Sequence, residues 1–555
     1  MKYYIIGALV VVVFFIVQSI RYRKENEKKM KKIVEESWGS MGEAVFSADE
    51  YEAVKGFFKE TTLKEDEYEV DSITANDIDL ERLYKRINHN FSSVGDEVLY
   101  KILLRPSFRK ELLEKREQII SYFQGHKEMA FEVQKEYMKL GRVKRVSFYK
   151  YITALKNLSV SGNGKNYLCI ILLFLMIGSF FISSALGAIL LVLVLGYNIT
   201  SYYSQKGTLD NYLICIAYLV GLCQAGDKIA KLNIPVLEEE KKSILDATNQ
   251  LSKITSKIGY LGSGAGGGSL GDMVFDYIRM MTHIDLIIFN NILKEIPKYL
   301  PVIEELYDCL GNIEALISVA SFRESLPYYG VPEFKKTDDY LVEELYHPLV
   351  ESPVANSLKE KRSVLLTGSN ASGKSTFLKS VALNAIFAQS IHTVMAKTYV
   401  TDMYEVYSSM ALHDNLEGEE SYFIVEIRSL KRIIDKEKSK HKIMGFVDEV
   451  LRGTNTVERI AASSCILENM AKENLKIFAA THDIELTDLL KEDYSNYHFE
   501  EEVKDQDVLF DYHLKSGKAM TRNAIALLNI TGYDKDLVNK AKKKAEEFMV
   551  TGTWS

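Results

Sequence analysis

An apolar run followed by a glycine-rich loop is the feature that most constrains how this chain folds. The segment SVLLTGSNASGKSTFLKSVALNAIFAQ predicts a buried strand, a loop and a helix. That context makes the motif Gly368-x-x-x-x-Gly373-Lys374-Ser375 more than a chance match. Glycines let backbone N–H groups curl around a phosphate, and the helix N-terminus adds its positive end. We expect Lys374 to reach the β- and γ-phosphates of a nucleotide, and the Ser375 hydroxyl to ligate Mg²⁺.

Two further apolar segments predict strands that end at the same edge. KIMGFVDEV ends in Asp448 and Glu449, and LKIFAATHD ends in Thr481-His482-Asp483. Asp448 is suited to hold Mg²⁺, and Glu449 to orient and deprotonate an attacking water. We expect His482 to donate a hydrogen bond to the γ-phosphate. Strands alternating with helices predict an α/β sheet with ATP at its rim, although the motifs do not give the strand order.

The N-terminal segment predicts attachment to a membrane. Tyr3 to Ile20 are eighteen residues without a charge, near the minimum for a helical span. The basic run RYRKENEKKMKK follows in place of a cleavage site, which favours an uncleaved anchor. Positive residues stay on the cytoplasmic side, so the rest of the chain is expected in the cytoplasm.

A second uncharged segment lies between Lys165 and Lys206 and is forty residues long. As one helix, residues 167–199 would extend about 50 Å, against about 30 Å of hydrocarbon. Two short spans with a turn near residues 182–187 fit better and keep both flanks on one side. The sequence therefore predicts three spans in all; one tilted span at 167–199 is the alternative.

The bulk composition is that of a globular protein with room for several domains. The chain has 555 residues, of which 47% are apolar and 26% charged. Five cysteines are scattered without CxxC spacing, which predicts neither a disulfide framework nor a zinc site. The net charge of −7 weighs against a chain devoted to nucleic-acid binding, since basic patches carry phosphate affinity.

One stretch is strongly basic despite the acidic total. Residues 101–165 hold fifteen Lys and Arg against six Glu. Residues such as Arg142, Lys144 and Arg145 are candidates to neutralise DNA phosphates. The same charges are also what a cytoplasmic flank of a membrane hairpin carries. Both interpretations of this stretch remain open.

The later motifs resemble those of MutS proteins. MALHDNLEGEESYFIVEIRSLKRII, VDEVLRGTNT and ATHD are similar to the ATPase domain of that family, and YHPLVE (346–351) to a motif before its first strand. IALLNITGYDKDLVNKAKKKAEE resembles its closing helix-turn-helix. SVGDEVLYKILLRP (93–106) and LYDCLGNIEALISVASF (306–322) look like pieces of its core and lever helices. The likeness covers most of residues 75 to 550.

The resemblance implies a head-to-tail homodimer in which each ATP, with Mg²⁺, lies between two subunits. Ser421, in ESYFIVE, matches the segment that reaches the nucleotide of the partner, and Asn370 matches a phosphate-site asparagine. Arg452, Gly453 and Thr454 match the loop after the catalytic carboxylates. The predicted nucleotide-binding residues are Gly368, Ser369, Asn370, Ala371, Ser372, Gly373, Lys374, Ser375, Thr376 and Ser421.

The chain departs from the family pattern at three positions around the site. Ser369 and Ser372 stand where MutS proteins usually carry proline and glycine, so the loop also resembles those of ABC and SMC ATPases. However, the chain carries no LSGGQ-type signature. Leu451 replaces a usual glycine, which bears on the geometry of the loop after the carboxylates.

The segment GFFKE (56–60) matches the G-x-F-x-E pattern of mismatch-reading MutS proteins. Only about thirty residues separate it from the core-like segment, too few for the mixed α/β domain that carries this motif in the family. Phe57 and Phe58 are therefore predicted to be core residues of a helix.

Together these features predict an α/β P-loop NTPase of the ABC/MutS-like type after a mainly α-helical region with transmembrane helices. The expected domains are an anchor at 1–20, a basic and helical linker at 21–74, and a core- and lever-like region at 75–334 interrupted by the hairpin. A MutS-type ATPase domain with a helix-turn-helix is expected at 335–555.

Two functions of different class follow. In the first, a membrane-anchored ATPase couples ATP hydrolysis to binding of mismatched or otherwise irregular DNA. In the second, the ATPase dimer is a conformational switch for a membrane process and binds no DNA.

Overall fold

The computed structural model describes residues 2–157, 162–262, 277–369, 372–410, 422–451, 455–504, 507–519, 525, 528 and 532–551. The chain divides into two compact units. Unit 1 comprises Met1–Thr62, Lys85–Ile102 and Glu117–Ser325, and unit 2 comprises Leu63–Tyr84, Leu103–Arg116 and Leu326–Ser555. The predicted boundary at residue 335 stays a prediction.

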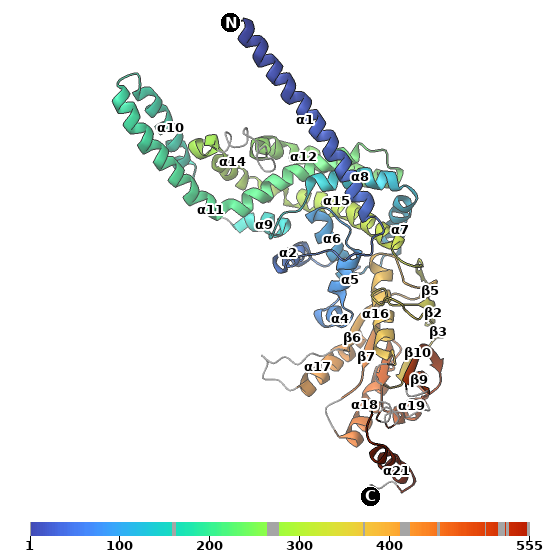
Figure 1. Cartoon of the computed structure of the whole chain (residues 1–555). Coiled ribbons are helices and arrows are strands. Elements are labelled where there is room, and N and C mark those ends of the chain that lie inside the picture. The colour runs from blue at the N-terminus through green and yellow to red at the C-terminus, as the bar shows by residue number, and fades with distance from the viewer. Residues whose placement is uncertain are drawn as a thin grey trace. The chain divides into compact units, whose positions relative to one another are not determined.

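The described residues up to 325 are mainly helical, as predicted for this region (Figure 1). Its helices are α1 (Lys2–Ser37), α2 (Ala48–Val54), α3 (Gly56–Glu60), α4 (Ser72–Asp77), α5 (Leu80–Ile87), α6 (Ser93–Leu104), α7 (Lys110–Gly125), α8 (Lys127–Leu140), α9 (Phe148–Ala154), η1 (Leu155–Asn157), α10 (Gly164–Ser179), α11 (Ser184–Ala230), η2 (Pro235–Leu237), α12 (Glu238–Gly262), α14 (Ile284–Leu293) and α15 (Ile296–Glu324).

Helix α1 continues well beyond the predicted anchor at 1–20. It runs to Ser37 because the basic flank is rich in good helix formers, and its i,i+4 pairs include Lys31–Glu35 at 3.6 Å. The C-terminal end of α1 packs within unit 1. Val34 is buried, and the ring of Trp38, the residue after the helix, meets Phe131 edge to face at 5.7 Å. The glycine-rich segment GSGAGGGSLG (262–271) predicts a loop and lies, apart from residue 262, outside the described residues.

Helices α10 and α11 form a hairpin, as predicted, but with different limits (Figure 1). The turn occupies residues 180–183 and so overlaps the first two residues of the predicted turn at 182–187. The predicted limits of the membrane hairpin, 167–199, stay a prediction; helix α11 itself continues without a break to Ala230. The second half of α11 is buried among the other helices of unit 1. This packing stabilises the helix beyond the charged residues near Lys206.

Two stretches of α11, Ser184–Gly207 and Asn211–Ala230, are long and apolar enough to cross a membrane among the described residues. They differ in their surroundings. Only 17% of the first is buried, against 61% of the second. The second therefore belongs to the helical core of unit 1, and the first is the part that leaves it.

Buried carboxyl groups tie the loops of unit 1 to its helices. Glu97 accepts hydrogen bonds from the Phe57 N–H (3.0 Å) and the Ser147 hydroxyl (3.1 Å). Glu314 accepts one from the Phe91 N–H (2.7 Å). Burial raises the pKa of both carboxyl groups to about 8, so near neutral pH the neutral form predominates. Phe57 itself is fully buried on α3, as predicted for a core residue.

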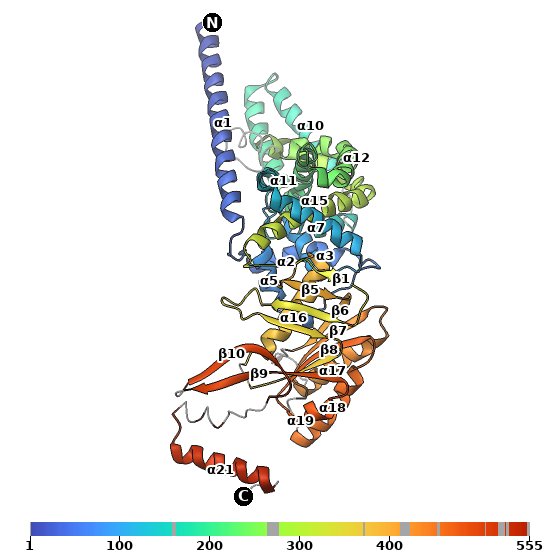
Figure 2. The ribbon, with the colours of Figure 1, turned by 90° about the vertical axis from the view of Figure 1, so that its right-hand side faces the viewer.

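Unit 2 is built around two sheets. In the larger sheet the strands lie in the order β10-β9-β4-β8-β7-β6, in which β9, β4, β8, β7 and β6 run parallel and β10 antiparallel (Figure 2). The smaller sheet has the order β1-β5-β2-β3. The strands are β1 (Glu333–Phe334), β2 (Tyr340–Leu345), β3 (Asn356–Glu360), β4 (Ser363–Thr367), β5 (Thr398–Thr401), β6 (Tyr404–Ser409), β7 (Lys442–Asp448), β8 (Leu475–Thr481), β9 (Tyr494–Lys504) and β10 (Asp507–Ser516).

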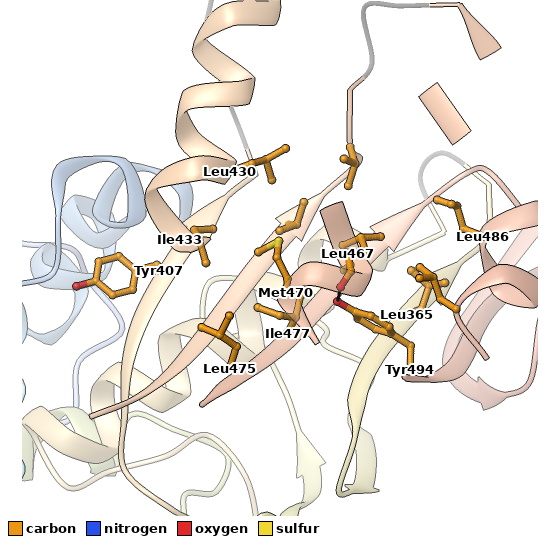
Figure 3. Packing of buried hydrophobic residues seen from close by; sticks show 14 of the residues in the cluster. Leu365, Tyr407, Leu430, Ile433, Leu467, Met470, Leu475, Ile477, Leu486 and Tyr494 are labelled. Atoms are coloured by element: carbon orange, nitrogen blue, oxygen red, sulfur yellow. Dashed lines mark hydrogen bonds between the residues drawn. The ribbon is translucent and has the colours of Figure 1, made fainter. Parts of the chain in front are cut away.

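The central strands are buried on both faces, which explains their continuous apolar sequences. On one face, side chains such as Ile443 and Ile477 pack against Leu430 and Leu467 from two covering helices (Figure 3). The Tyr494 hydroxyl donates a hydrogen bond to the Leu467 carbonyl at 2.8 Å. The helices after residue 325 are α16 (Lys374–Ser390), α17 (Tyr422–Asp435), η3 (Lys436–Lys438), α18 (Thr456–Met470), α19 (Glu485–Leu489) and α21 (Lys535–Thr551).

Two short segments from the helical part of the sequence complete unit 2. Asp77 of α4 accepts hydrogen bonds from the Ser408 hydroxyl (2.6 Å) and the Met410 N–H (2.9 Å) at the end of β6. The Phe108 ring stacks on His441 at 3.7 Å. These contacts anchor the edge of the larger sheet.

Close helix packing in unit 1 gives a test of the fold. A Cβ added at Gly311 of α15 would lie 2.2 Å from Val98 Cγ2 and 2.8 Å from the Val94 carbonyl oxygen of α6. Gly311→Ala is therefore expected to destabilise the protein by about 1–3 kcal/mol through overpacking, despite the better helix propensity of alanine. The measurement is the thermal unfolding of both proteins followed by circular dichroism.

Gly125→Ala is the matched control, because no atom lies within 4 Å of the added Cβ at the end of α7. A melting temperature of Gly311→Ala equal to or above that of the control would contradict the packing described here.

Candidate functional site

A pocket of about 760 Å³ opens where strands β4 and β7 end. Lys374, Ser375, Asp448 and Glu449 line one part of it. The same pocket is also lined by apolar and aromatic side chains, which include Tyr346, Pro353, Val354, Phe499 and Tyr512. A volume of this size suits a nucleotide, and the two linings suit its phosphates and its base.

The backbone of the glycine-rich loop requires its two motif glycines. Gly368 has φ +144° and Gly373 φ +109°, and a Cβ on Gly368 would lie 2.7 Å from the Phe499 carbonyl oxygen. Lys374 is 5% exposed, and its Nζ donates to the carbonyl oxygens of Gly368 (2.8 Å) and Ser369 (2.7 Å). The ammonium group thus lies over the loop, where an anion would meet it.

The three predicted polar strand ends meet at this edge. Ser375 Oγ donates to Asp448 Oδ2 at 2.5 Å. His482 Nε2 lies 2.6 Å from Glu449 Oε1. The pairing of β7 with β8 explains this, since Asp448 stands opposite Ala480 and the Glu449 N–H donates to the Ala480 carbonyl at 2.8 Å.

The loop after the carboxylates is held in an unusual conformation. Glu449 and Leu451 have φ of +62° and +61°, in the left-handed region that favours glycine. This explains why a glycine is usual at the position of Leu451. The strain of about 1 kcal/mol is offset by burial of the leucine side chain in the core cluster, worth about 2 kcal/mol. The Leu451 N–H also donates to Glu426 Oε1 at 2.6 Å.

Several contacts next to the site were not predicted from the sequence motifs. Arg459 of α18 makes two hydrogen bonds to Asp483, at 2.9 and 2.6 Å, and these raise the pKa of Arg459. Ser369 Oγ donates to Glu501 of β9. Asn356 donates to the Tyr512 carbonyl at 3.0 Å and thereby supports a bulge in β10. Only Ser369 and Asp483 stood in motifs; Arg459, Glu501, Asn356 and Tyr512 become visible through the strand order.

The remaining loop residues are placed as follows. Ser372 is 1% exposed, and Thr376 lines the pocket at the start of α16. The other predicted residues of the composite site lie outside the described residues: Asn370, Ala371, Ser421, Arg452, Gly453 and Thr454.

Many basic residues of the stretch at 101–165, which is shared between the two units, are paired with acidic residues. Ion pairs join Lys101 to Asp308 at 2.8 Å and Arg142 to Asp96 at 2.6 Å. Arg142 also donates to the Asn90 carbonyl, so it is a structural residue. At least eight of the fifteen basic residues form ion pairs with described residues: Lys101, Arg105, Arg109, Lys110, Lys127, Lys135, Lys139 and Arg142.

The family model of MutS domain V matches residues 364–549. The DNA mismatch repair protein MutS of Thermotoga maritima is 30% identical over 265 residues, which cover 46% of this chain and 33% of the relative. The MutS of Bacillus licheniformis is 28% identical over 337 residues (58% of this chain, 37% of the relative), and mouse MutS protein homolog 4 is 31% identical over 264 residues (44% and 27%). The alignments thus span about a third of each relative.

The wall of the pocket contains a histidine whose titration can be tested. His347 is 6% exposed and accepts a hydrogen bond from the Leu349 N–H at Nδ1. Burial, with the nearby Lys379 ammonium, lowers the pKa of His347 to about 4. In the unfolded chain the pKa is about 6.5, so stability is full above pH 6.5 and falls by about 2 kcal/mol on going to pH 5.

The measurement is the free energy of unfolding of unit 2 at pH 7.5 and pH 5 in the wild type and in His347→Gln. The difference between the two pH values is expected to shrink by about 2 kcal/mol in the variant. An unchanged pH dependence would mean that His347 is protonated in the folded protein as easily as in the unfolded chain.

Proposed function

Since the chain belongs to the MutS family, we propose that its MutS domain V binds and hydrolyses ATP. The observation that carries the proposal is the meeting of Lys374, the Ser375–Asp448 pair and the Glu449–His482 pair at one pocket. These groups supply a cation for phosphates, oxygen donors for a metal and a carboxylate base.

The Ser375 hydroxyl and the Asp448 carboxylate form the donor set for Mg²⁺. They are hard oxygen ligands, they are hydrogen-bonded to each other at 2.5 Å, and both line the pocket. Mg²⁺ is usually held by one or two such protein ligands together with waters and phosphate oxygens. Bound Mg²⁺ would neutralise charge on the β- and γ-phosphates. Loop N–H groups and the Lys374 ammonium would hold those phosphates in line.

Glu449 is proposed as the base that takes a proton from the attacking water. Its carboxylate is bonded to His482, and its backbone is held by β8, so its position is defined before the nucleotide arrives. His482 would leave Glu449 to donate to the γ-phosphate oxygen. The nucleobase would lie against Tyr512 and Val354 in the apolar part of the pocket.

We further propose that the active form is a homodimer with ATP between the subunits, to which Ser421 contributes. The names of the relatives describe DNA mismatch repair proteins. We carry this to the present chain as a proposal: ATP turnover is coupled to binding of mismatched or otherwise irregular DNA. Membrane attachment through α1 and the α10–α11 hairpin would keep the ATPase domain at the cytoplasmic face, and three crossings result where both hairpin arms pass through the bilayer.

A second candidate function is an ATP-driven switch for a membrane process that binds no DNA. The distribution of basic residues favours it. Five members of the 101–165 stretch make no ion pair with a described residue, and they lead up to the hairpin: Lys144, Arg145, Lys150, Lys156 and Lys165. Basic residues at the foot of a membrane hairpin can contact anionic head groups, and this explains their presence without DNA binding.

Loss of the Glu449 carboxylate is expected to stop hydrolysis while leaving binding intact. In Glu449→Gln the rate of phosphate release should fall by about 10²–10⁴-fold, because the side chain keeps its shape but cannot accept a proton. ATP affinity, measured by equilibrium binding, should stay close to that of the wild type. Asp448→Asn is the matched comparison, because it removes a proposed Mg²⁺ ligand and not the base. It is expected to raise the Mg²⁺ concentration that hydrolysis requires. A Glu449→Gln enzyme with wild-type turnover would exclude this carboxylate as the base.

The two candidate functions differ in the effect of Lys144 and Arg145. If DNA is bound here, neutralising both to Gln should weaken DNA binding and reduce the slope of log affinity against log salt by about 2. Arg142 must be left in place, because its loss would leave Asp96 buried without its cation. Neutralising the exposed Lys335 and Lys336 of unit 2 is the control. Absence of DNA binding would favour the membrane switch. DNA binding that is equal in both double variants would instead exclude Lys144 and Arg145 as the DNA contacts.

A further inference from the structure

The part of the hairpin that leaves unit 1 is apolar on almost every side. No charged residue occurs between Lys165 and Lys206. Phe174 on α10 and Val192 on α11 are each 70% exposed. The side chains that are buried, such as Met176 and Val194, are those between the two arms. Such a surface requires an apolar environment.

A buried polar network marks where the hairpin is still held by protein. His283 has no exposed surface, and its Nδ1 lies 3.1 Å from Asn166 Oδ1 on α10, while its Nε2 lies 3.0 Å from the Asn198 carbonyl oxygen on α11. The Asn198 amide donates to the carbonyls of Cys169 (3.2 Å) and Met281 (2.9 Å). Only the residues beyond this network are free to enter lipid.

The free arms are too short to cross a bilayer. From Asn166 to Ser179, and from Asn198 to Ser184, each arm measures about 20 Å at 1.5 Å per residue. The hydrocarbon core of a bilayer is about 30 Å thick, so one leaflet contributes about half of that. Each arm therefore matches one leaflet and part of its interface.

The turn is built for hydrocarbon. Phe181 and Ile182 are 90% and 81% exposed. The N–H groups of Phe180, Phe181, Ile182 and Ser183 all donate to carbonyls of residues 177–179. Lipid offers no partners for backbone groups, so this internal pairing suits a buried turn. A turn that emerged into water on the far side would instead expose these apolar side chains.

The foot of the hairpin has the residues of a membrane interface. Tyr167, Tyr197 and Tyr203 are 50%, 47% and 60% exposed, near the level of the polar network. Tyrosine rings favour the head-group region. Lys165 and Lys206 stand at the two ends of the uncharged segment, where they can meet anionic lipids.

We propose that the α10–α11 hairpin inserts into the cytoplasmic leaflet alone, as a wedge whose turn lies near the bilayer midplane. Its partner is the hydrocarbon of that leaflet. This deepens the membrane attachment proposed above and rests on it; the crossings then reduce from three to the one at α1.

Tryptophan depth measurement tests the proposal. The full chain has two tryptophans, which Trp38→Phe and Trp554→Phe remove. Phe181→Trp or Tyr197→Trp is then introduced, and the protein is reconstituted in vesicles of phosphatidylcholine with phosphatidylglycerol. The phosphatidylcholine is brominated either near the methyl end of its acyl chains or near the carbonyl groups. Phe181 and Tyr197 are exposed, so replacing them does not disturb the core, and phenylalanine at position 38 keeps an aromatic ring next to Phe131.

We expect the Phe181→Trp protein to be quenched several-fold more by the deep bromines, and the Tyr197→Trp protein by the shallow ones. Iodide on either side of the membrane should not quench the former. Shallow quenching of Phe181→Trp, together with quenching by iodide on the far side, would show a hairpin that crosses the bilayer. Quenching of both proteins by iodide and by neither brominated lipid would instead overturn the membrane attachment of the hairpin.

Discussion

Parallel pairing of β4 with β8, and of β8 with β7, is the constraint on which the candidate site depends. The carboxyl ends of these strands lie at one edge of the sheet. Parallel pairing alone therefore brings the loop after β4 close to the side chains that follow β7 and β8. Thr367, the last residue of β4, pairs with Thr481, and Asp448 pairs with Ala480. A slip of one residue in either pairing would turn these side chains to the other face of the sheet.

Buried polar groups do comparable work in the helical unit. Glu97, Glu314 and His283 each join backbone segments that are far apart in sequence, and each is buried. Such groups are costly to bury unless they are fully hydrogen-bonded, so their partners define how the loops sit. The His283 network has the added effect of separating the packed part of the hairpin from its free part.

Much of the site could be predicted because its chemistry lies in contiguous motifs. The strand, loop and helix around Gly373, and the strands ending at Asp448 and Thr481, lie where the apolar runs placed them. The contacts of Ser369 with Glu501 and of Arg459 with Asp483 could not be predicted, since they follow from strand order and helix rotation, which short motifs do not encode. The end of helix α11 at Ala230 could not be predicted for a different reason: hydropathy marks where a helix is apolar, whereas packing against neighbouring helices decides where it ends.

The chain passes from one unit to the other at five places, after residues 62, 84, 102, 116 and 325. Unit 2 is therefore not encoded by one contiguous stretch of the chain. A gene fragment starting at residue 335 would encode every nucleotide-site motif, yet it would lack Asp77 and Phe108, whose partners on β6 and beside β7 would face solvent. Recombination that transplants the ATPase as one contiguous block would therefore deliver an incomplete sheet edge, so the two units are expected to be inherited together.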